Sequence, residues 1–282
     1  MKPSWLKAKM PSGQNYHRLK GLLKELNLHT VCEEAHCPNI GDCWQRQTAT
    51  VMIMGDTCTR SCGFCAVKTG RPLALDHLEP EHVAEAISRL GLKHVVITSV
   101  DRDDLSDGGA AHFAATIRQV KARCPNTQVE VLIPDFKGKP EALGKIFSEK
   151  PDFLNHNLET VRSLQRQVRP QADYDRSLAV LRMATEARLI SKSGIMLGLG
   201  EAKEEICQAL KDLREVGRIS ILTIGQYLRP TPQHLEVKRY YSPEEFAEWK
   251  CYAQELGFEH VASGPMVRSS YHADEAAAEF QN

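Results

Sequence analysis

Residues 50–65 read TVMIMGDTCTRSCGFC. The stretch begins with an apolar run, as expected of a strand that is buried on both faces of a parallel sheet. Three cysteines follow the run, and Cys58, Cys62 and Cys65 have the spacing C-x3-C-x2-C. Barrel folds carry their functional residues at the carboxyl ends of their strands. The stretch therefore predicts a β/α fold with a thiol-rich loop at the end of its first strand.

The strand pattern recurs five more times along the chain, with a helical pattern between successive strands. The predicted strands are residues 50–55, 94–100, 128–133, 153–158, 190–199 and 221–228. The predicted helices are residues 79–91, 108–123, 139–149, 173–188 and 201–217, with a last helix near 242–256. This alternation predicts parallel β/α units, and six units are fewer than the eight of a closed barrel. We expect an incomplete (β/α)6 barrel at residues 50–240, an N-terminal extension without regular pattern at 1–49, and a C-terminal helix and tail at 241–282.

The composition excludes several classes of function. The 282 residues carry 36 Lys+Arg and 36 Asp+Glu, so the formal net charge is zero, whereas a non-specific nucleic-acid binder has a basic excess. No apolar run approaches the roughly 18 residues that span a bilayer. No apolar segment follows the basic residues at the N-terminus, so a secretory signal is not expected. We expect a cytoplasmic protein that binds neither nucleic acid nor membrane.

Six of the nine cysteines lie between Cys32 and Cys65. In a reducing compartment such clustering predicts metal ligands rather than disulfides. The C-x3-C-x2-C loop can hold three irons of a [4Fe–4S] cluster and leave the fourth iron open to a small molecule. The alternative is a zinc knuckle, but zinc motifs usually pair C-x2-C with a second such pair, and none follows Cys65.

A second triad, formed by Cys32, Cys37 and Cys43, has the spacing C-x4-C-x5-C. This spacing departs from common zinc patterns, yet three thiolates so close in sequence still require a metal. His36 is a possible fourth ligand, and its alternative role is that of an ordinary loop residue. The remaining cysteines share no spacing, and we expect them to be small buried apolar residues in helices; they are Cys124, Cys207 and Cys251.

The first triad, with Phe64 just before its last cysteine, resembles the radical S-adenosylmethionine superfamily. The resemblance implies that the open iron binds S-adenosylmethionine. Electron transfer then cleaves this cofactor and yields a 5′-deoxyadenosyl radical, which takes hydrogen from unactivated carbon.

The order of the two triads and the stretch VCEEAHCPNIGDCW at 31–44 resemble the lipoyl synthase family in particular, as does RSSY at 268–271. The resemblance implies two [4Fe–4S] clusters, the second held by the extensions on Cys32, Cys37, Cys43 and Ser270. It implies a sulfurtransferase of lipoate biosynthesis and protein lipoylation that inserts sulfur at C6 and C8 of an octanoyl chain, with the second cluster as sulfur donor. Alkyl C–H bonds have no acidity, so acid–base residues could not do this chemistry.

The same resemblance implies the partners. The octanoyl chain is carried on a lysine of a lipoyl carrier domain, either a 2-oxoacid dehydrogenase E2 subunit or the glycine cleavage H protein. An electron donor such as flavodoxin or ferredoxin reduces the clusters.

Polar residues at strand ends are candidates for the cofactor pocket. Asn157 and Glu159 in NHNLET (155–160) match a segment shared by lipoyl and biotin synthases that contacts the ribose and the substrate; otherwise they cap the next helix. Ser99 and Asp101 lie in TSVDRDD (98–104), which in the family approaches the methionyl end of the cofactor. The acidic residues of that loop do not fit a calcium-binding EF-hand, and Asp107 is expected to cap the following helix.

Glycines in SGIMLGLGE (193–201) allow close backbone approach, as for an adenine ring, or form an ordinary strand-to-helix turn with Glu201 at the helix N-terminus. Arg169, Gln226 and Tyr227 also match family motifs. The candidate cofactor residues are Phe64, Ser99, Asp101, Asn157, Glu159, Arg169, Gly198 and Gly200.

Three other functions stay open at this stage. Biotin synthase has similar chemistry, but its second cluster is held by residues spread along the barrel strands. A zinc-stabilised barrel would bind a ligand without redox chemistry. A cluster carrier would transfer its cluster to an acceptor without cleaving S-adenosylmethionine.

Overall fold

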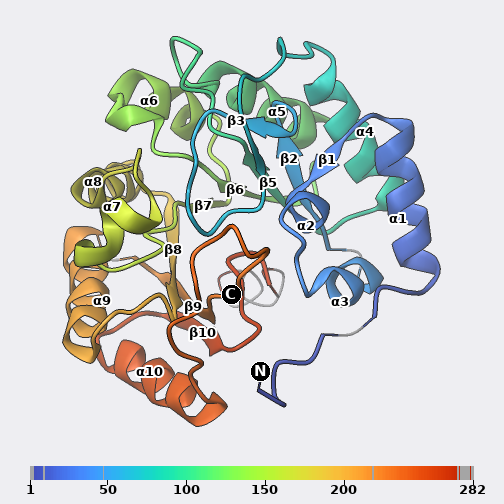
Figure 1. Ribbon diagram of the computed structural model, residues 1–282. Coiled ribbons are helices and arrows are strands. Elements are labelled where there is room, and N and C mark those ends of the chain that lie inside the picture. Colours follow the sequence, from blue (N-terminus) through green and yellow to red (C-terminus); the bar gives the residue numbers. More distant parts are fainter. Residues whose placement is uncertain are drawn as a thin grey trace. The chain divides into compact units, whose positions relative to one another are not determined.

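The computed structural model describes residues 3–8, 10–46, 48–217, 219–271, 273 and 280 (Figure 1). The chain forms two compact units. The first unit consists mainly of Ala8–Arg60 and Val67–Phe153, and the second mainly of Ser61–Ala66 and Leu154–Tyr271. The boundary falls inside strand β7 (Phe153–Asn155).

The first unit begins with a small helical segment and continues as β/α units. Its helices are α1 (Gln14–Glu25), α2 (Val31–Glu34), α3 (Ile40–Gln45), α4 (Glu79–Leu90), α5 (Ala110–Arg123), the 3₁₀ turn η1 (Phe136–Gly138) and α6 (Pro140–Ser148). Its strands are β1 (His29–Thr30), β2 (Thr50–Ile53), β3 (Thr57–Cys58), β4 (Lys68–Thr69), β5 (His94–Ser99) and β6 (Gln128–Leu132).

Strands β2, β5 and β6 are parallel neighbours, in register at Val51↔Ile97 and Ile97↔Val131. Short β1 pairs with β2 in the antiparallel sense, and β3 pairs with β4 in a separate two-stranded sheet. Val95 and Val96 point to opposite faces of the sheet and are both fully buried, as expected of a parallel sheet that is covered on both sides. Helix α5 packs against α4 and α6 (Figure 1).

The second unit continues the same β/α alternation. Its helices are the 3₁₀ turn η2 (Arg162–Leu164), α7 (Gln165–Val168), α8 (Tyr174–Glu186), α9 (Lys203–Gly217) and α10 (Pro243–Glu255). Its strands are β8 (Ile190–Leu197), β9 (Ile221–Gln226) and β10 (His260–Gly264). Strand β9 lies between β8 and β10 and is parallel to both.

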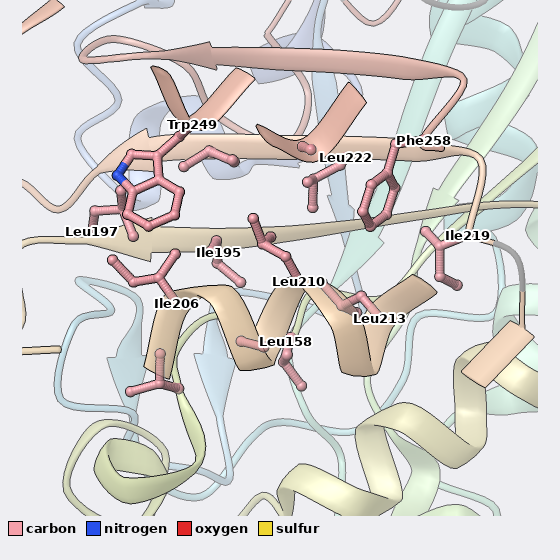
Figure 2. Close-up of a cluster of buried hydrophobic side chains, with 14 of the residues drawn as sticks. Leu158, Ile195, Leu197, Ile206, Leu210, Leu213, Ile219, Leu222, Trp249 and Phe258 are labelled. Carbon is pink, nitrogen blue, oxygen red and sulfur yellow. The ribbon is translucent and has the colours of Figure 1, made fainter. Parts of the chain in front are cut away.

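The core of the second unit lies between α9 and the strands. Ile206, Leu210 and Leu213 recur at helical spacing on one face of α9 and are fully buried. Figure 2 shows this face pointing toward Ile195 of β8 and Leu222 of β9. Burying a leucine side chain stabilises the fold by about 1.5–3 kcal/mol, so this helix face holds the second unit together.

The structure confirms the parallel β/α alternation, and each of the six predicted strands contains an observed one. Two parts of the prediction were wrong. Residues 1–49 contain α1, α2, α3 and β1 rather than an irregular extension. The sequence analysis also missed β10, because HVASG contains three small residues and no run of large apolar ones. Within the part of the chain that the structure describes, no helix is both long and apolar enough to cross a bilayer.

Candidate radical and sulfur-donor sites

Cys58 ends β3 and belongs to the first unit. Its Sγ accepts hydrogen bonds from the backbone N–H groups of Arg60 (3.4 Å) and Asp101 (3.3 Å). Burial raises the pKa of the Cys58 thiol, and the nearby Asp101 carboxylate adds to the rise. Two N–H donors at one sulfur are suited to a thiolate that shares its charge with a metal cluster.

A strained turn leads from β2 into this loop. Met54 has a left-handed backbone (φ 69°), and its N–H donates to Glu79 Oε2 at 2.8 Å. The same oxygen lies 2.6 Å from His112 Nε2, and Glu79 and His112 are both buried. A left-handed conformation costs a bulky residue about 1–3 kcal/mol, so the Glu79–His112 pair stabilises the turn that precedes Cys58.

Cys62 and Cys65 lie in the second unit, where distant residues hold their loop. The backbone of Gly63 bonds to Val168 O (2.9 Å) and to Leu235 N (3.0 Å). His234 Nε2 donates to the carbonyl oxygen of Cys65 at 2.9 Å, because a carbonyl can only accept. The Phe64 side chain packs against a small cluster of buried apolar residues. This cluster consists of Val168, Leu199 and Tyr227.

The three cysteines of the second triad come together in the first unit. Cys32 lies in α2 and Cys43 in α3. Burial, reinforced by the neighbouring Cys37, raises the pKa of Cys32 to about 11. Burial, reinforced by Cys32 and Cys37, raises the pKa of Cys43 to about 12. Cys37 thus disfavours ionisation of both other thiols, and a bound cationic cluster would reverse that repulsion.

His36 was the sequence's candidate for a fourth ligand of this triad. It is exposed and occupies a left-handed turn (φ 51°) between Cys32 and Cys37. Ser270, the ligand that the family resemblance implied, is partly buried and belongs to the second unit.

The segment that carries Ser270 packs on strand β9. A Cβ built on Gly225 would lie 2.2 Å from Val267 O and 3.4 Å from Arg268 Nη1. Only glycine therefore allows this close approach. Tyr271 N donates to Arg268 O at 2.9 Å, which closes a turn around Ser270.

Asn157 and Glu159 lie together in the second unit. Asn157 Nδ2 donates to Glu159 Oε1 at 3.0 Å, while Asn157 Oδ1 is buried without a hydrogen-bond partner. Burial raises the pKa of the Glu159 carboxyl, and the charges of Arg169 and Arg268 oppose that rise. A Cβ on Gly194 would come within 3.1 Å of Asn157 Oδ1. An unpartnered buried acceptor beside a glycine fits a ligand that carries hydroxyl donors.

Arg169 holds the backbone of this segment. Its Nη1 donates to the carbonyl oxygens of Asn157 (3.0 Å) and Leu158 (3.2 Å). In this structure Arg169 therefore orients the strand end that carries Asn157 and Glu159.

Gly198 and Gly200 both have positive φ, 106° and 118°. A Cβ on Gly198 would meet Gln226 Nε2 at 2.2 Å, so the chain's own side chain occupies the space beside it. The Glu201 carboxylate accepts the N–H groups of Gly198, Leu199 and Gly200 and so binds the loop rather than the first turn of α9. Gln226 in turn donates to the carbonyl oxygens of Leu197 and Arg239. These two bonds give Gln226, one of the residues that match family motifs, a structural role.

In the first unit, Ser99 Oγ is buried without a hydrogen-bond partner. The acidic residues that follow it do not form a calcium site. Asp101 and Asp103 pair with Arg60, and Asp104 pairs with Arg102. Asp107 accepts the N–H groups of Gly109 and Ala111 at the start of α5, as the sequence predicted.

The prediction for the three cysteines outside the triads is confirmed in part: Cys207 and Cys251 lie in helices, and Cys124 is buried. Cys124 is buried, but it follows the last residue of α5; Cys207 is half-buried and Cys251 is exposed. The buried residues of α10 include Phe246, Trp249 and Ala253, and the helical period turns Cys251 away from them. No disulfide joins any of the nine cysteines, all of which the structure describes. Among the described residues, no group of His, Cys, Asp and Glu side chains is tight enough to hold a single metal ion.

The fold and the cysteine loop agree with a known class of protein. The family model of the radical SAM superfamily matches residues 52–213. The fold is similar to that of methylornithine synthase, with a TM-score of 0.58 and 16% identity over 94% of this chain and 85% of that one. It is also similar to Streptococcus suis SuiB bound to precursor peptide SuiA, with a TM-score of 0.59 and 14% identity over 95% and 56% of the two chains. The chain is a radical SAM protein.

More specific matches cover nearly the whole chain. The model for the N-terminal domain of lipoyl synthase matches residues 1–37. The chain is 58% identical to the lipoyl synthase of Rubrobacter xylanophilus (97% of this chain, 86% of that one) and 56% identical to that of Thermus thermophilus (97% and 85%). It is 54% identical to the lipoyl synthase of Flavobacterium johnsoniae (96% and 94%). The chain belongs to the lipoyl synthase family, which confirms the resemblance inferred from its motifs.

Several residues near the sites were not predicted from the sequence. Arg60, Glu79, His112, His234 and Arg268 support or adjoin the proposed ligands. The pairing of Arg60 could have been suspected from the sequence. It is a cation inside the cysteine loop, and aspartates follow two of the predicted strands. Arg268 is the first residue of the RSSY motif, although no role was predicted for it. Glu79, His112 and His234 contact residues far away in sequence, so no local pattern identifies them.

Proposed function

We propose that this chain is a radical SAM sulfurtransferase that inserts two sulfur atoms, at C6 and C8, into an octanoyl chain on a lysine of a lipoyl carrier domain. The observation that carries the proposal is the second group of thiols, Cys32, Cys37 and Cys43. Radical SAM chemistry needs only the triad at residues 58–65. A second triad of thiols, of which Cys32 is buried and Cys37 and Cys43 are partly buried, would hold the additional cluster that sulfur donation requires.

The residues present fit two [4Fe–4S] clusters. Cys58, Cys62 and Cys65 would hold one cluster, and Ser270 would join the second triad to hold the other. The N–H donors at Cys58 Sγ and the grouped thiols of the second triad support these assignments. When bound, the first cluster with S-adenosylmethionine supplies the radical that removes hydrogen from the octanoyl chain, and the second cluster supplies the sulfur.

The chain's own residues would bind and orient the cofactor. Asn157 Oδ1 would accept a hydrogen bond from it, and the Ser99 hydroxyl would donate or accept one; both atoms are buried and unpartnered. Glu159 would accept from its ribose. Arg169 would keep Asn157 in place through the backbone. Asp101 would face the methionyl end, and Phe64 and Gly200 would shape the pocket. Gly198 does not fit that role, because Gln226 and Arg239 occupy the space beside it.

The finer architecture belongs to the same proposal. Residues 50–240 would form the incomplete (β/α)6 barrel, to which β10 adds one more parallel strand beside β9. The segments before and after the barrel would carry the second cluster. The substrate carrier would be an E2 subunit or the glycine cleavage H protein, reduction would come from flavodoxin or ferredoxin, and the site of action would be the cytoplasm.

The test is anaerobic incubation of the reconstituted protein with S-adenosylmethionine, a reductant and an octanoyl-lysine peptide, followed by mass spectrometry. A peptide that gains two sulfur atoms, with 5′-deoxyadenosine formed, supports the proposal. Cleavage of S-adenosylmethionine without sulfur insertion would reject the substrate, and no cleavage in protein that holds both clusters would reject the enzyme.

Three cysteine variants separate the two sites. Cys58→Ala should abolish cleavage of S-adenosylmethionine. Cys37→Ala should retain cleavage, lose sulfur insertion and bind about half of the iron, since one of two equal clusters is lost. Cys251→Ala is the matched control, because this cysteine is exposed on α10, and it should behave as the wild-type protein.

A further inference from the structure

Arg60 is a buried arginine inside the first cysteine loop. Its side chain is 2% exposed. Its Nε and Nη2 donate to the two oxygens of Asp103 at 2.8 and 3.0 Å, and Nη2 also donates to Asp135 at 2.7 Å. Asp101 Oδ1 lies 3.3 Å from Nε. A buried guanidinium is tolerated only when carboxylates compensate its lost hydration, and here three carboxylates fix it in one orientation.

The carboxylates come from the ends of two parallel strands. Asp101 and Asp103 follow β5, and Asp135 follows β6. Asp135 is fully buried and also accepts the N–H of Lys137 at 3.0 Å. The Lys137 ammonium, half exposed, lies 3.7 Å from Asp103. Because the hydrogen-bonded sheet fixes these strand ends, they form a rigid anchor for the Arg60 side chain.

The backbone around Arg60 converges on Cys58. Arg60 N and Asp101 N donate to Cys58 Sγ. Thr59 Oγ1 donates to Asp101 O at 2.9 Å and accepts from Asp103 N at 3.0 Å. Asp101 and Asp103 thus contact both the Arg60 side chain and the backbone that surrounds Cys58. N–H donors at a cluster sulfur stabilise the more negative, reduced state and so raise the reduction potential.

We propose that Arg60 is a positioning residue for the first cluster. Pinned by Asp103 and Asp135, it holds two backbone N–H groups on the Cys58 sulfur and makes the cluster easier to reduce. This inference rests on the proposed function only in taking Cys58 as a cluster ligand. The role depends on the geometry of the guanidinium and not on its charge alone. A lysine at this position therefore does not replace arginine, because the lysine ammonium lacks the planar fork that engages Asp103 and Asp135 together.

The test is a redox titration of the reconstituted protein followed by electron paramagnetic resonance. The first cluster is recognised because its signal changes when S-adenosylmethionine is added. In Arg60→Gln and in Arg60→Lys, we expect the midpoint potential to become more negative. The ratio of reduced to oxidised cluster at a fixed potential should fall about tenfold, the effect of weakening one hydrogen bond to a charged group. Arg118→Gln, which breaks an exposed ion pair with Glu149 in the same unit, should leave the potential unchanged.

The outcomes separate this inference from the proposed function. An unchanged midpoint in Arg60→Gln overturns the inference, and so does a wild-type midpoint in Arg60→Lys, because charge alone would then suffice. If Arg60→Gln fails to fold, Arg60→Lys still decides, since it keeps the buried positive charge. If the wild-type protein binds iron but shows no signal that responds to S-adenosylmethionine, the proposed function itself fails.

Discussion

Gly225→Ala should separate radical formation from sulfur insertion. Gly225 lies on β9 beneath the segment that carries Ser270, and its backbone φ is one that alanine can adopt. The new Cβ would lie 2.2 Å from Val267 O, whereas ordinary contact begins at 3.4 Å. The segment must therefore withdraw by about 1.2 Å, and a misplacement of about 1 Å can reduce a reaction rate about 100-fold.

The expected result is a fall of about 100-fold in lipoyl product per 5′-deoxyadenosine formed, because Ser270 moves with Val267 while the first cysteine triad is untouched. Both products are measured by mass spectrometry in the octanoyl-lysine peptide assay. Overpacking of this kind typically destabilises a fold by about 1–3 kcal/mol, so circular dichroism should first confirm that the variant is folded at the assay temperature.

Gly264→Ala is the matched control. Gly264 pairs with Gly225 in the sheet, and a Cβ there would meet only the Val267 Cγ2 methyl at 3.4 Å. It should keep the wild-type ratio of products. If Gly225→Ala also keeps that ratio, the reasoning that connects β9 to the placement of Ser270 is refuted.

Three further predictions concern stability. Leu210→Ala removes a fully buried side chain of α9 and should lower the free energy of unfolding by about 2–5 kcal/mol, measured by urea denaturation. Glu79→Ala leaves the buried Met54 N–H unpaired and should cost about 1–3 kcal/mol, whereas a loss below about 0.5 kcal/mol would show that the turn needs no such support. In metal-free protein, the folded state keeps Cys32 and Cys43 protonated up to pH values of about 11 and 12, while the unfolded chain ionises from about pH 8.5. Stability should therefore be constant below that pH and fall above it, by up to about 1.4 kcal/mol per pH unit for each thiol, and a flat thermal-unfolding profile to pH 10 would contradict this.

The strands were predictable because their signal is local. Residues 95–97 form a continuous apolar run, and such runs between helical patterns indicate a parallel sheet. Helix α1 also had a local signal, since its buried leucines 19, 22 and 23 recur at helical spacing. The irregular sequence that follows the helix obscures this signal. The exposure of Cys251 could likewise have been derived from the helical period of α10.

The support around the sites was not predictable in the same way. Arg60 lies 43 residues from Asp103 and 75 from Asp135, and their meeting depends on which strands become neighbours. His234 reaches Cys65 across 169 residues. A sequence motif identifies candidate metal ligands, because their spacing is local. It does not identify the residues that support those ligands, because only the tertiary fold brings these residues into contact with them.

The raised pKa values of the second triad also bear on how the metal-free chain survives exposure to oxidants. Thiolates react with oxidants and thiols do not. With a pKa of about 11 for Cys32 and about 12 for Cys43, both groups remain in the thiol form at about pH 8. We expect the newly made chain to resist sulfenic acid and disulfide formation at these positions. If these thiols bind iron as proposed, the same burial that makes them release protons on binding would also protect them from oxidation beforehand.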